Sequence, residues 1–350
     1  MASTAAGTPV HPGCTRAEDA PLATHTTFGV PAQARRLVTL LDSTALPGVL
    51  ADRDIGDGPL LVLGQGSNVL FTQDWPGTVL QVRTRGIGVM DEDGGRTRVR
   101  VEAGESWDAF VGWSLAQGLC GLENLVAIPG TVGAAPIQNI GAYGGEVGEF
   151  IESVEAFDRT TGAACRLDRA ACRFGYRDSL FKHAPGRYVI TGVTFLLPHE
   201  RPLRTGYPGV QEELAALGAG EPTPSRIATA IRRVRARKLP DPARTGNAGS
   251  FFKNPQVSPA EAEALQRAHP GMPAWPTPDG RVKLSAAWLV EACGFKGLQD
   301  GPAAVSAQHA LVLVNLGGAT GAQVWALAER IRAGVRARFG IALEPEPQVL

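Results

Sequence analysis

The segment that decides the fold is rich in small residues and reads Ile128-Pro129-Gly130-Thr131-Val132-Gly133-Ala134-Ala135-Pro136-Ile137-Gln138-Asn139-Ile140-Gly141-Ala142-Tyr143-Gly144-Gly145. Its small side chains let a ligand lie against bare backbone, and Gln138 and Asn139 offer amides to the edges of a heterocycle. So little bulk over so long a segment costs chain entropy unless something binds there. We interpret the segment as a ligand-binding loop, with a buried structural loop as the alternative.

A second glycine-rich segment follows the apolar run 60–63, which is typical of a buried strand, and reads Gly64-Gln65-Gly66-Ser67-Asn68. Free backbone N–H groups and a hydroxyl around one point suit an anion such as a pyrophosphate. Alone, this segment is more simply a tight turn. It is not Gly-x-Gly-x-x-Gly, which argues against a Rossmann fold. Two such loops together suggest one large dinucleotide, and a flavin fits better than a nicotinamide.

Outside these loops the pattern predicts both helices and strands without strict alternation, which favours an α+β fold over a doubly wound sheet. Helices are expected where apolar residues recur at helical spacing between cap and stop residues. The residues 91–96 are expected to form the polar tip of a hairpin. The expected helices are 106–117, 224–238, 285–293 and 320–339, and the expected strands are 60–63, 78–83, 97–103, 151–157, 188–197 and 311–315.

The composition of the 350 residues excludes several classes of protein. Lys plus Arg and Asp plus Glu both number 34, so the chain lacks the basic surplus of most nucleic-acid-binding proteins. No apolar run is long enough for a membrane span, and the first residues lack the apolar core of a signal peptide. The five cysteines are scattered, with no metal-ligand spacing, which favours a reduced, cytoplasmic, metal-free protein. Residues 1–20 are expected to be a disordered tail.

The two glycine-rich loops resemble the FAD-binding fold of the vanillyl-alcohol-oxidase group. Other segments narrow the resemblance to the UDP-N-acetylenolpyruvoylglucosamine reductase (UDP-N-acetylmuramate dehydrogenase) family, from about His25 to the C-terminus. Gly-Ser-Phe-Phe-Lys-Asn-Pro, at 249–255, is the most specific of them. The segments are Tyr176-Arg177-Asp178-Ser179-Leu180-Phe181-Lys182, Lys238-Leu239-Pro240-Asp241-Pro242, Gly246-Asn247-Ala248-Gly249-Ser250-Phe251-Phe252-Lys253-Asn254-Pro255, Ser285-Ala286-Ala287-Trp288-Leu289 and Leu343-Glu344-Pro345-Glu346.

The resemblance implies NADPH-dependent, FAD-mediated reduction of UDP-N-acetylglucosamine enolpyruvate to UDP-N-acetylmuramate, for bacterial peptidoglycan precursors. A hydride from the flavin N5 reaches the vinyl carbon, and a proton must then reach the neighbouring carbon. Ser250 matches the proton donor, while Arg177 and Glu346 match the residues that stabilise the enol. Serine is a weak acid and needs a neighbour that stabilises the alkoxide or resupplies the proton.

The resemblance also implies binding residues and domains. Substrate contacts are expected from Tyr143, Tyr207, Lys238 and Asn254. Two FAD-binding subdomains (21–85, and 86–238 joined by 341–350) and a substrate-binding domain (239–340) are expected, in a monomer without nucleic-acid or membrane partners. The expected FAD contacts are Gly64, Gln65, Gly66, Ser67, Asn68, Pro129, Gly130, Thr131, Gly133, Ala134, Gln138, Asn139, Gly141, Tyr143 and Gly144.

The sequence departs from the family pattern in two places. Ala304-Val305-Ser306-Ala307-Gln308-His309 differs from its common form, which puts a substrate-contacting amide there in doubt. The chain also stops soon after Glu346, which suggests a more mobile tail. Another flavoenzyme of the same FAD fold, such as an oxidase of alcohols, is the second hypothesis. A non-catalytic basic-helix protein, built on Arg232, Arg233, Arg235 and Arg237, is the third.

Overall fold

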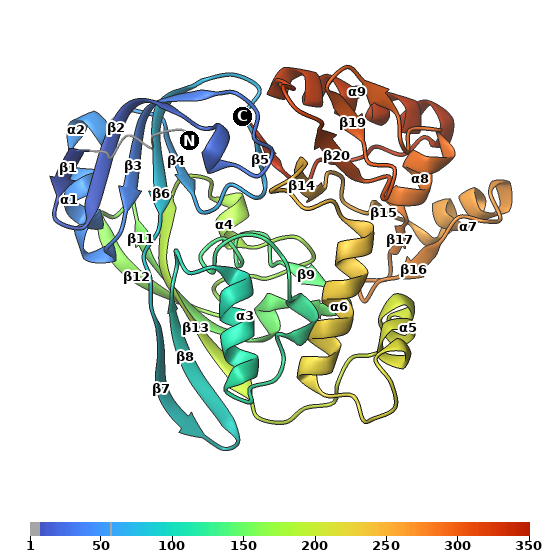
Figure 1. Cartoon of the computed structure of the whole chain (residues 1–350), viewed down its shortest axis with the longest axis horizontal. Coiled ribbons are helices and arrows are strands. Elements are labelled where there is room, and N and C mark those ends of the chain that lie inside the picture. The colour runs from blue at the N-terminus through green and yellow to red at the C-terminus, as the bar shows by residue number, and fades with distance from the viewer. Residues whose placement is uncertain (1–7, 57) are drawn as a thin grey trace. The chain divides into compact units, whose positions relative to one another are not determined.

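The computed structural model describes residues 8–56 and 58–350 (Figure 1). Its chain folds into two compact units, each assembled from segments that are distant in the sequence. Unit 1 contains the chain up to Ala20, Ala34–Gln65 and Pro76–Arg235. Unit 2 contains Pro21–Gln33, Gly66–Trp75 and Ala236–Leu350.

Unit 1 begins with a five-stranded sheet of order β1-β2-β3-β6-β4, in which β1 and β2 are antiparallel and β4 and β6 are parallel. Two short helices, α1 and α2, connect β3 to β4 (Figure 1). The strands are β1 (Thr8–His11), β2 (Cys14–Pro21), β3 (Gln33–Leu40), β4 (Leu60–Leu63) and β6 (Trp75–Val82), and the helices are α1 (Leu46–Ala51) and α2 (Arg53–Gly56).

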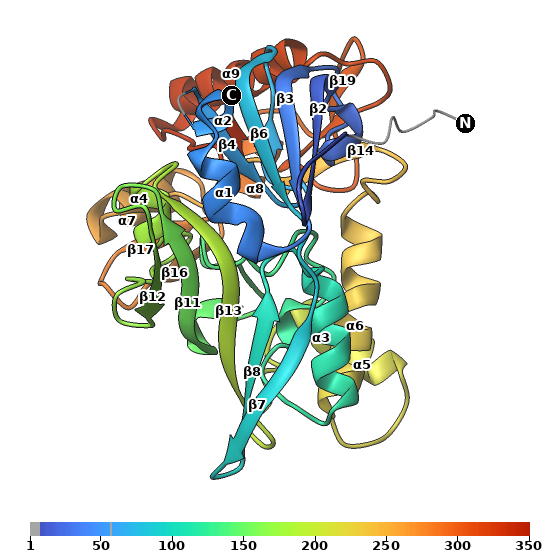
Figure 2. The same ribbon diagram turned by 90° about the vertical axis from the view of Figure 1, so that its left-hand side faces the viewer.

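The second sheet of unit 1 is antiparallel, with the order β12-β11-β13-β8-β7. Figure 2 shows the long β7–β8 hairpin, with α3 beside the sheet. Its strands are β7 (Ile87–Asp93), β8 (Arg96–Glu102), β11 (Ile151–Asp158), β12 (Ala163–Asp168) and β13 (Tyr188–Pro198). The remaining elements are α3 (Trp107–Ala116), β9 (Gly141–Ala142), β10 (Gly145–Glu146), α4 (Leu180–His183), α5 (Pro208–Ala216) and α6 (Pro224–Lys238).

An aromatic cluster fixes α3 to this sheet. Phe110 of α3 lies 4.7 Å from Phe195 of β13, and Trp107 lies 6.2 Å from the same ring, as measured between centroids. All three side chains are fully buried, and each such pair adds about 0.5–1.5 kcal/mol beyond its area burial. Ser106 caps the helix by accepting a hydrogen bond from the Ala109 N–H, as its sequence predicts. The aromatic cluster and the cap therefore hold α3 firmly against the sheet, ahead of the Gly-rich segment in the chain.

Unit 2 has its own apolar core. There α8 packs against α9, and α9 packs against β19 and β20. The main sheet has the order β14-β20-β19-β18 and is antiparallel, while β15-β17-β16 and the parallel pair β21-β5 are smaller. The elements are β5 (Val69–Leu70), β14 (Gly246–Ser250), β15 (Gln256–Val257), α7 (Pro259–Ala268), β16 (Ala274–Pro276), β17 (Val282–Leu284), α8 (Ala286–Ala292), β18 (Gln299–Asp300), β19 (Ala303–Val305), β20 (Val312–Asn315), α9 (Gly321–Phe339) and β21 (Gln348–Val349).

The predicted α+β class and all the predicted helices and strands are confirmed, with ends shifted by a few residues at most. The expected disordered tail is wrong for Thr8–Ala20, because β1 and β2 join the first sheet there; residues 1–7 lie outside the described part of the chain. Buried Cys14 and Ala20 anchor β2, and Arg36 reaches Glu18 at 3.1 Å. Among the described residues, no helix is both long and apolar enough to cross a membrane.

Candidate active site

The two glycine-rich loops predicted to bind a cofactor meet within unit 1. The Gly130 N–H donates a hydrogen bond to Gln65 Oε1 at 3.1 Å. A Cβ at Gly64 would lie only 2.4 Å from Thr131 Oγ1, and one at Gly133 would lie 2.6 Å from the Ala103 Cβ. The backbone of these two glycines thus packs directly against neighbouring side chains, with no room for a side chain of its own. Of the other expected FAD contacts, Pro129, Ala134, Gln138 and Gly144 lie in the second loop, and Gly66, Ser67 and Asn68 begin the next segment of unit 2.

This close approach makes Gly64 sensitive to any side chain. We expect Gly64→Ala to force Thr131 out of place, to cost about 1–3 kcal/mol in unfolding free energy, and to lower the FAD content of the purified protein. The control is Gly112→Ala in α3, where a Cβ would meet nothing within 4 Å. It should gain about 0.5–1 kcal/mol and keep its FAD. Flavin absorbance per protein and thermal unfolding measure both; full FAD content with an unchanged Tm in Gly64→Ala would contradict the expectation.

Asn139 holds the second loop in shape. Its side-chain N–H groups donate to the Glu146 carboxylate and to the Gly175 carbonyl, both at 2.9 Å, and its oxygen accepts from the Gly148 N–H at 2.8 Å. The residue is buried and has a left-handed backbone, with φ of 47°. Its amide is thus bonded to protein groups, and the predicted FAD contact of Asn139 stays a prediction.

Arg177 lies against the same loop. Its Nη2 donates to the Gly141 carbonyl at 2.7 Å, and a Cβ at Gly141 would come within 3.0 Å of Nη1, so glycine makes room for the guanidinium. The backbone of Arg177 is left-handed, with φ of 52°, and its carbonyl accepts a hydrogen bond from Lys182 Nζ at 2.8 Å. The resemblance names Arg177 as catalytic, and the fold places it beside the predicted cofactor loop.

Tyr143 and Tyr207, both expected to contact substrate, lie together although they are far apart in the sequence. Their ring centroids are 5.0 Å apart, in an edge-to-face arrangement. Arg204 ties the second tyrosine's segment to the loop by donating to the Gly144 carbonyl and pairing with Glu149 at 2.6 Å. Tyr207 is 47% exposed, so part of the pair faces solvent.

Arg235 of α6 is a residue that sequence reasoning placed wrongly, on the polar side of the helix. It is partly buried; its Nε donates to the Ala127 carbonyl at 3.1 Å and its guanidinium bonds Tyr143. Burial lowers the pKa of Arg235 and raises that of Tyr143, although each opposes the other's shift. Helical periodicity gives no signal for this contact.

Two neighbouring arginines of α6 are engaged within unit 1. Arg232 pairs with both carboxylate oxygens of Asp108, at 2.7 and 2.8 Å, and Arg233 lies 3.8 Å from Glu213. An arginine whose charge is neutralised by a carboxylate attracts the phosphates of a nucleic acid only weakly. The basic-helix hypothesis therefore loses half of the four arginine charges on which it depended.

Ser250 and Glu346 are neighbours in unit 2. Ser250 ends β14 and lies opposite Val312 of β20. The next residue, Phe251, accepts a hydrogen bond through its carbonyl from the Glu346 N–H at 2.8 Å. Segments almost one hundred residues apart are thereby joined next to Ser250.

The expected mobile tail at Glu346 is wrong. The Glu346 carbonyl accepts a hydrogen bond from Asn68 Nδ2 at 3.2 Å, and the Leu350 carbonyl accepts one from the Thr72 N–H at 2.7 Å. Between them, β21 pairs with β5 in parallel. These bonds hold both sides of Glu346, which is half-buried.

The remaining predicted substrate residues, Lys238 and Asn254, also lie in unit 2. Lys238 is exposed at the last turn of α6, where the helix dipole favours a cation. Asn254 Oδ1 accepts a hydrogen bond from the Ala286 N–H at 3.0 Å, at the start of α8. This bond orients the amide so that its N–H groups remain as donors.

The segment that departs from the family pattern begins in β19 and continues into the turn before β20. His309 Nδ1 accepts a hydrogen bond from the Leu311 N–H at 3.2 Å, which assigns the proton of the neutral ring to Nε2. Burial lowers the pKa of His309, and Lys238 and Lys296 lower it further. The ring is therefore neutral at pH 7. It offers one N–H donor in the segment where the family's substrate-contacting amide was in doubt.

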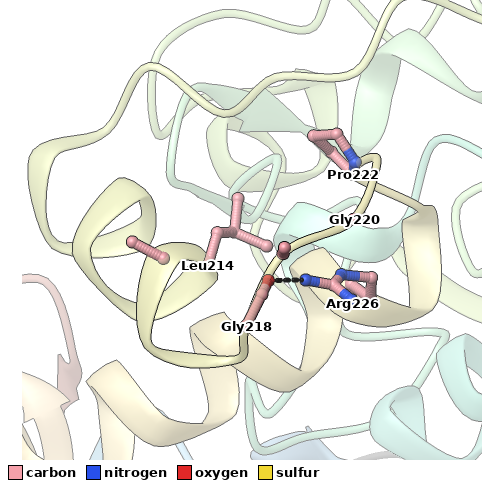
Figure 3. Close-up of a pocket in the computed structure, with 7 residues that line it drawn as sticks. Leu214, Gly218, Gly220, Pro222 and Arg226 are labelled. Carbon is pink, nitrogen blue, oxygen red and sulfur yellow. Dashed lines mark hydrogen bonds between the residues drawn. The ribbon is translucent and has the colours of Figure 1, made fainter.

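A pocket of about 300 Å³ lies in unit 1 (Figure 3). It is formed by the end of α5, the start of α6 and the loop that joins them. Arg226 Nη2 closes one side by donating to the Gly218 carbonyl at 2.7 Å. Because no predicted site residue lines it, this pocket has no part in the site described above. Its lining is Leu214, Ala215, Gly218, Ala219, Gly220, Pro222 and Arg226.

A model of the FAD binding domain matches residues 50–168, and a model of the UDP-N-acetylenolpyruvoylglucosamine reductase C-terminal domain matches residues 241–350. The reductase of Xanthomonas euvesicatoria is 52% identical over 97% of this chain and 98% of its own, and that of Chromobacterium violaceum is 50% identical over 95% and 98%. The crystal structure of the reductase from Thermus caldophilus matches 96% of this chain and 98% of its own, at 29% identity and a TM-score of 0.66. Half of all residues are thus shared over nearly the whole length, and the chain belongs to the UDP-N-acetylenolpyruvoylglucosamine reductase family.

Proposed function

We propose that this protein reduces UDP-N-acetylglucosamine enolpyruvate to UDP-N-acetylmuramate with NADPH, in the synthesis of peptidoglycan precursors. Family membership supports the reaction. The observation that carries the assignment of residues is the hydrogen bond from the Glu346 N–H to the Phe251 carbonyl, because it joins two predicted catalytic segments beside Ser250. The second hypothesis, another flavoenzyme of the same fold, gives no reason for these two segments to be joined beside Ser250.

FAD, when bound, would supply hydride transfer from NADPH to the vinyl carbon of the substrate. The residues that would hold it are the facing loops around Gly64 and Thr131, whose backbone N–H groups suit its pyrophosphate. Their residues bind and orient the group, and they exclude water from it.

Arg177 stabilises the negative charge that develops on the substrate carboxylate after hydride addition. A guanidinium stays protonated and can hold a carboxylate through two parallel N–H donors. The bond from Nη2 to the Gly141 carbonyl fixes the plane of the guanidinium before the substrate arrives. The stabilising charge is therefore in place at no cost of reorganisation.

Ser250 donates the proton that completes the reduction. Its Oγ–H bond breaks, a C–H bond forms at the enol carbon, and the alkoxide must be reprotonated from solvent. Glu346, held next to Phe251, polarises the enol or supplies a proton to it. Serine is too weak an acid to act on an unactivated alkene, so it acts on the electron-rich enol that hydride addition produces.

The diphosphate of the substrate is bound by Lys238 and Asn254, and by the tyrosine pair Tyr143 and Tyr207. Lysine is a compact cation that suits phosphate. The half-exposed Tyr207 can cover a bound phosphate with its hydroxyl. We also infer the domain division 21–85, 86–238 with 341–350, and 239–340. We further infer a cytoplasmic monomer, for which the five free cysteines among the described residues suit a reducing compartment.

The test of this function is NADPH oxidation by the purified protein with and without UDP-N-acetylglucosamine enolpyruvate. We expect a yellow protein whose NADPH consumption depends on the sugar and yields one UDP-N-acetylmuramate per NADPH. A yellow protein that oxidises an alcohol and ignores the enolpyruvyl sugar would support the second hypothesis. A colourless protein that takes up no FAD would exclude both.

A further inference from the structure

Arg177 occupies a strained position in a tight turn of unit 1. Gly175 and Asp178 exchange both of their main-chain hydrogen bonds, at 3.0 and 3.2 Å, so that Tyr176 and Arg177 are the two central residues of the turn. The backbone of Arg177 has a φ of 52°, in the left-handed region, where a turn of this kind favours glycine or asparagine. A residue with a longer side chain stays in this conformation only when its surroundings hold it there.

Both ends of the turn are tied to the Gly-rich loop. The Gly175 carbonyl accepts a second hydrogen bond, from Asn139 Nδ2 at 2.9 Å. On the other side of the turn, the buried Ser179 donates from its Oγ to the Ile137 carbonyl at 2.6 Å. These two bonds place the turn on the loop, but neither of them reaches the carbonyl of Arg177 itself.

Lys182 makes the contact with that carbonyl. Its Nζ donates to the Arg177 carbonyl at 2.8 Å, from the short helix α4 that follows the turn. A hydrogen bond from a charged donor is roughly twice as strong as one between neutral groups. Because the carbonyl belongs to the peptide plane that follows Arg177, this bond fixes the backbone from which the guanidinium projects.

Helix α4 is anchored by contacts of its own. Phe181 is buried and packs edge-on against Tyr188 of β13, with ring centroids 5.7 Å apart. The Leu180 N–H donates to the Cys172 carbonyl at 2.8 Å. The ammonium group of Lys182 therefore projects from a fixed base, and its removal should leave the helix folded.

We propose that Lys182 is a positioning residue for the second half-reaction. It holds the main chain of Arg177, while the bond from Nη2 to the Gly141 carbonyl at 2.7 Å holds the guanidinium. Fixed at both ends, the guanidinium meets the substrate carboxylate in one orientation. This inference rests on the proposed function, in which Arg177 stabilises the charge that develops after hydride transfer. Lys182 acts through Arg177 and needs no contact with the substrate.

The first experiment measures flavin reoxidation in Lys182→Met, which keeps an unbranched stem and removes the ammonium. At saturating enolpyruvyl sugar we expect the rate to fall about ten- to a hundredfold, the scale of a small misplacement of a reacting group. Flavin reduction by NADPH and the Tm should change little. Lys182→Arg, whose guanidinium can donate to the same carbonyl, should restore most of the rate.

A double-mutant cycle separates an effect through Arg177 from a general one. In the Arg177→Lys background, Lys182→Met should slow reoxidation by less than about twofold, because the group that Lys182 positions is already absent. The matched control is Arg159→Met, which removes another cationic side chain that donates to a main-chain carbonyl at 2.8 Å in unit 1, that of Gly186, and should leave the rate unchanged. A normal rate in Lys182→Met, or an equal fold loss in both backgrounds, would overturn the proposal.

Hydrogen exchange tests the positioning itself and does not need the sugar. The Asp178 N–H, which is bonded to the Gly175 carbonyl, should exchange about ten times faster in Lys182→Met, whereas the amides of α6 should exchange as in the wild type. Unchanged exchange at Asp178 would show that Lys182 does not hold the turn. If the wild type fails to reoxidise its flavin with the sugar, the proposed function is wrong, and the exchange rates still decide whether Lys182 holds Arg177. Lys182→Gln, which is too short to reach the carbonyl, replaces Lys182→Met in all three measurements if the latter does not fold.

Discussion

Replacement of Ser250 by alanine is expected to leave flavin reduction by NADPH unchanged and to slow flavin reoxidation by the enolpyruvyl sugar about 10²–10⁴-fold, the usual contribution of a positioned general acid. The hydroxyl has no part in the first half-reaction, because no proton is delivered to carbon there. In the second half-reaction, the enol formed in the variant would have to take its proton from water. Anaerobic stopped-flow absorbance of the flavin resolves the two half-reactions.

The matched control is Ser258→Ala, in the same unit. Ser258 caps α7, where its Oγ accepts from the Glu261 N–H and the Glu261 carboxylate accepts from the Ser258 N–H. Its loss should cost about 0.5–2 kcal/mol in stability and leave both half-reactions intact. If Ser250→Ala reoxidises at the normal rate, the proton comes from another group, and Glu346 becomes the first to test.

Arg177→Lys is expected to give the second large effect, a fall of about 10²–10³-fold in the reoxidation step, comparable to the loss of one oxyanion donor. Lysine keeps the charge but replaces two parallel donors by one point. It also cannot both bond the Gly141 carbonyl and hold a carboxylate in the same plane. FAD content and reduction by NADPH should change little.

Arg187→Lys in the same unit provides the comparison for Arg177→Lys. Arg187 donates to both carboxylate oxygens of Asp158, at 3.1 and 2.7 Å, which holds the pKa of that carboxyl at about 2. Arg187→Lys should change the free energy of unfolding and leave the turnover rate unchanged. Equal losses of turnover in the two variants would mean that Arg177 acts through the fold and not through the substrate.

Most of the secondary structure could be predicted because it depends on local patterns. Helix α6 begins and ends where the sequence predicts, since Ile227, Ile231 and Val234 mark one buried face and Pro240 follows its end. Strand β2 could not be predicted, because its own residues carry no apolar alternation and it is stabilised by neighbours such as Arg36. The residues that stabilise β2 lie in its neighbour β3, so the sequence of β2 itself does not reveal the strand.

The site was predictable in its residue types and unpredictable in its contacts. The resemblance named Ser250 and Glu346, but nothing local in the sequence shows that the Phe251 carbonyl joins them. Arg235 was missed because helical periodicity assigns a face to each residue and is silent about which polar side chains a neighbouring loop will cover. Asn139 was expected to offer its amide to the cofactor; the sequence does not show that the folded loop bonds this amide to Glu146, Gly175 and Gly148, and the FAD contact stays a prediction.

The contact between Gly64 and Thr131 also has an evolutionary consequence. Because a Cβ at position 64 would overlap the threonine hydroxyl, the two positions should not vary independently among descendants of this gene. A lineage that acquires alanine at 64 should more often carry a residue smaller than threonine at 131, because that residue relieves the overlap. Thr131→Gly should therefore lower the cost of Gly64→Ala in unfolding free energy.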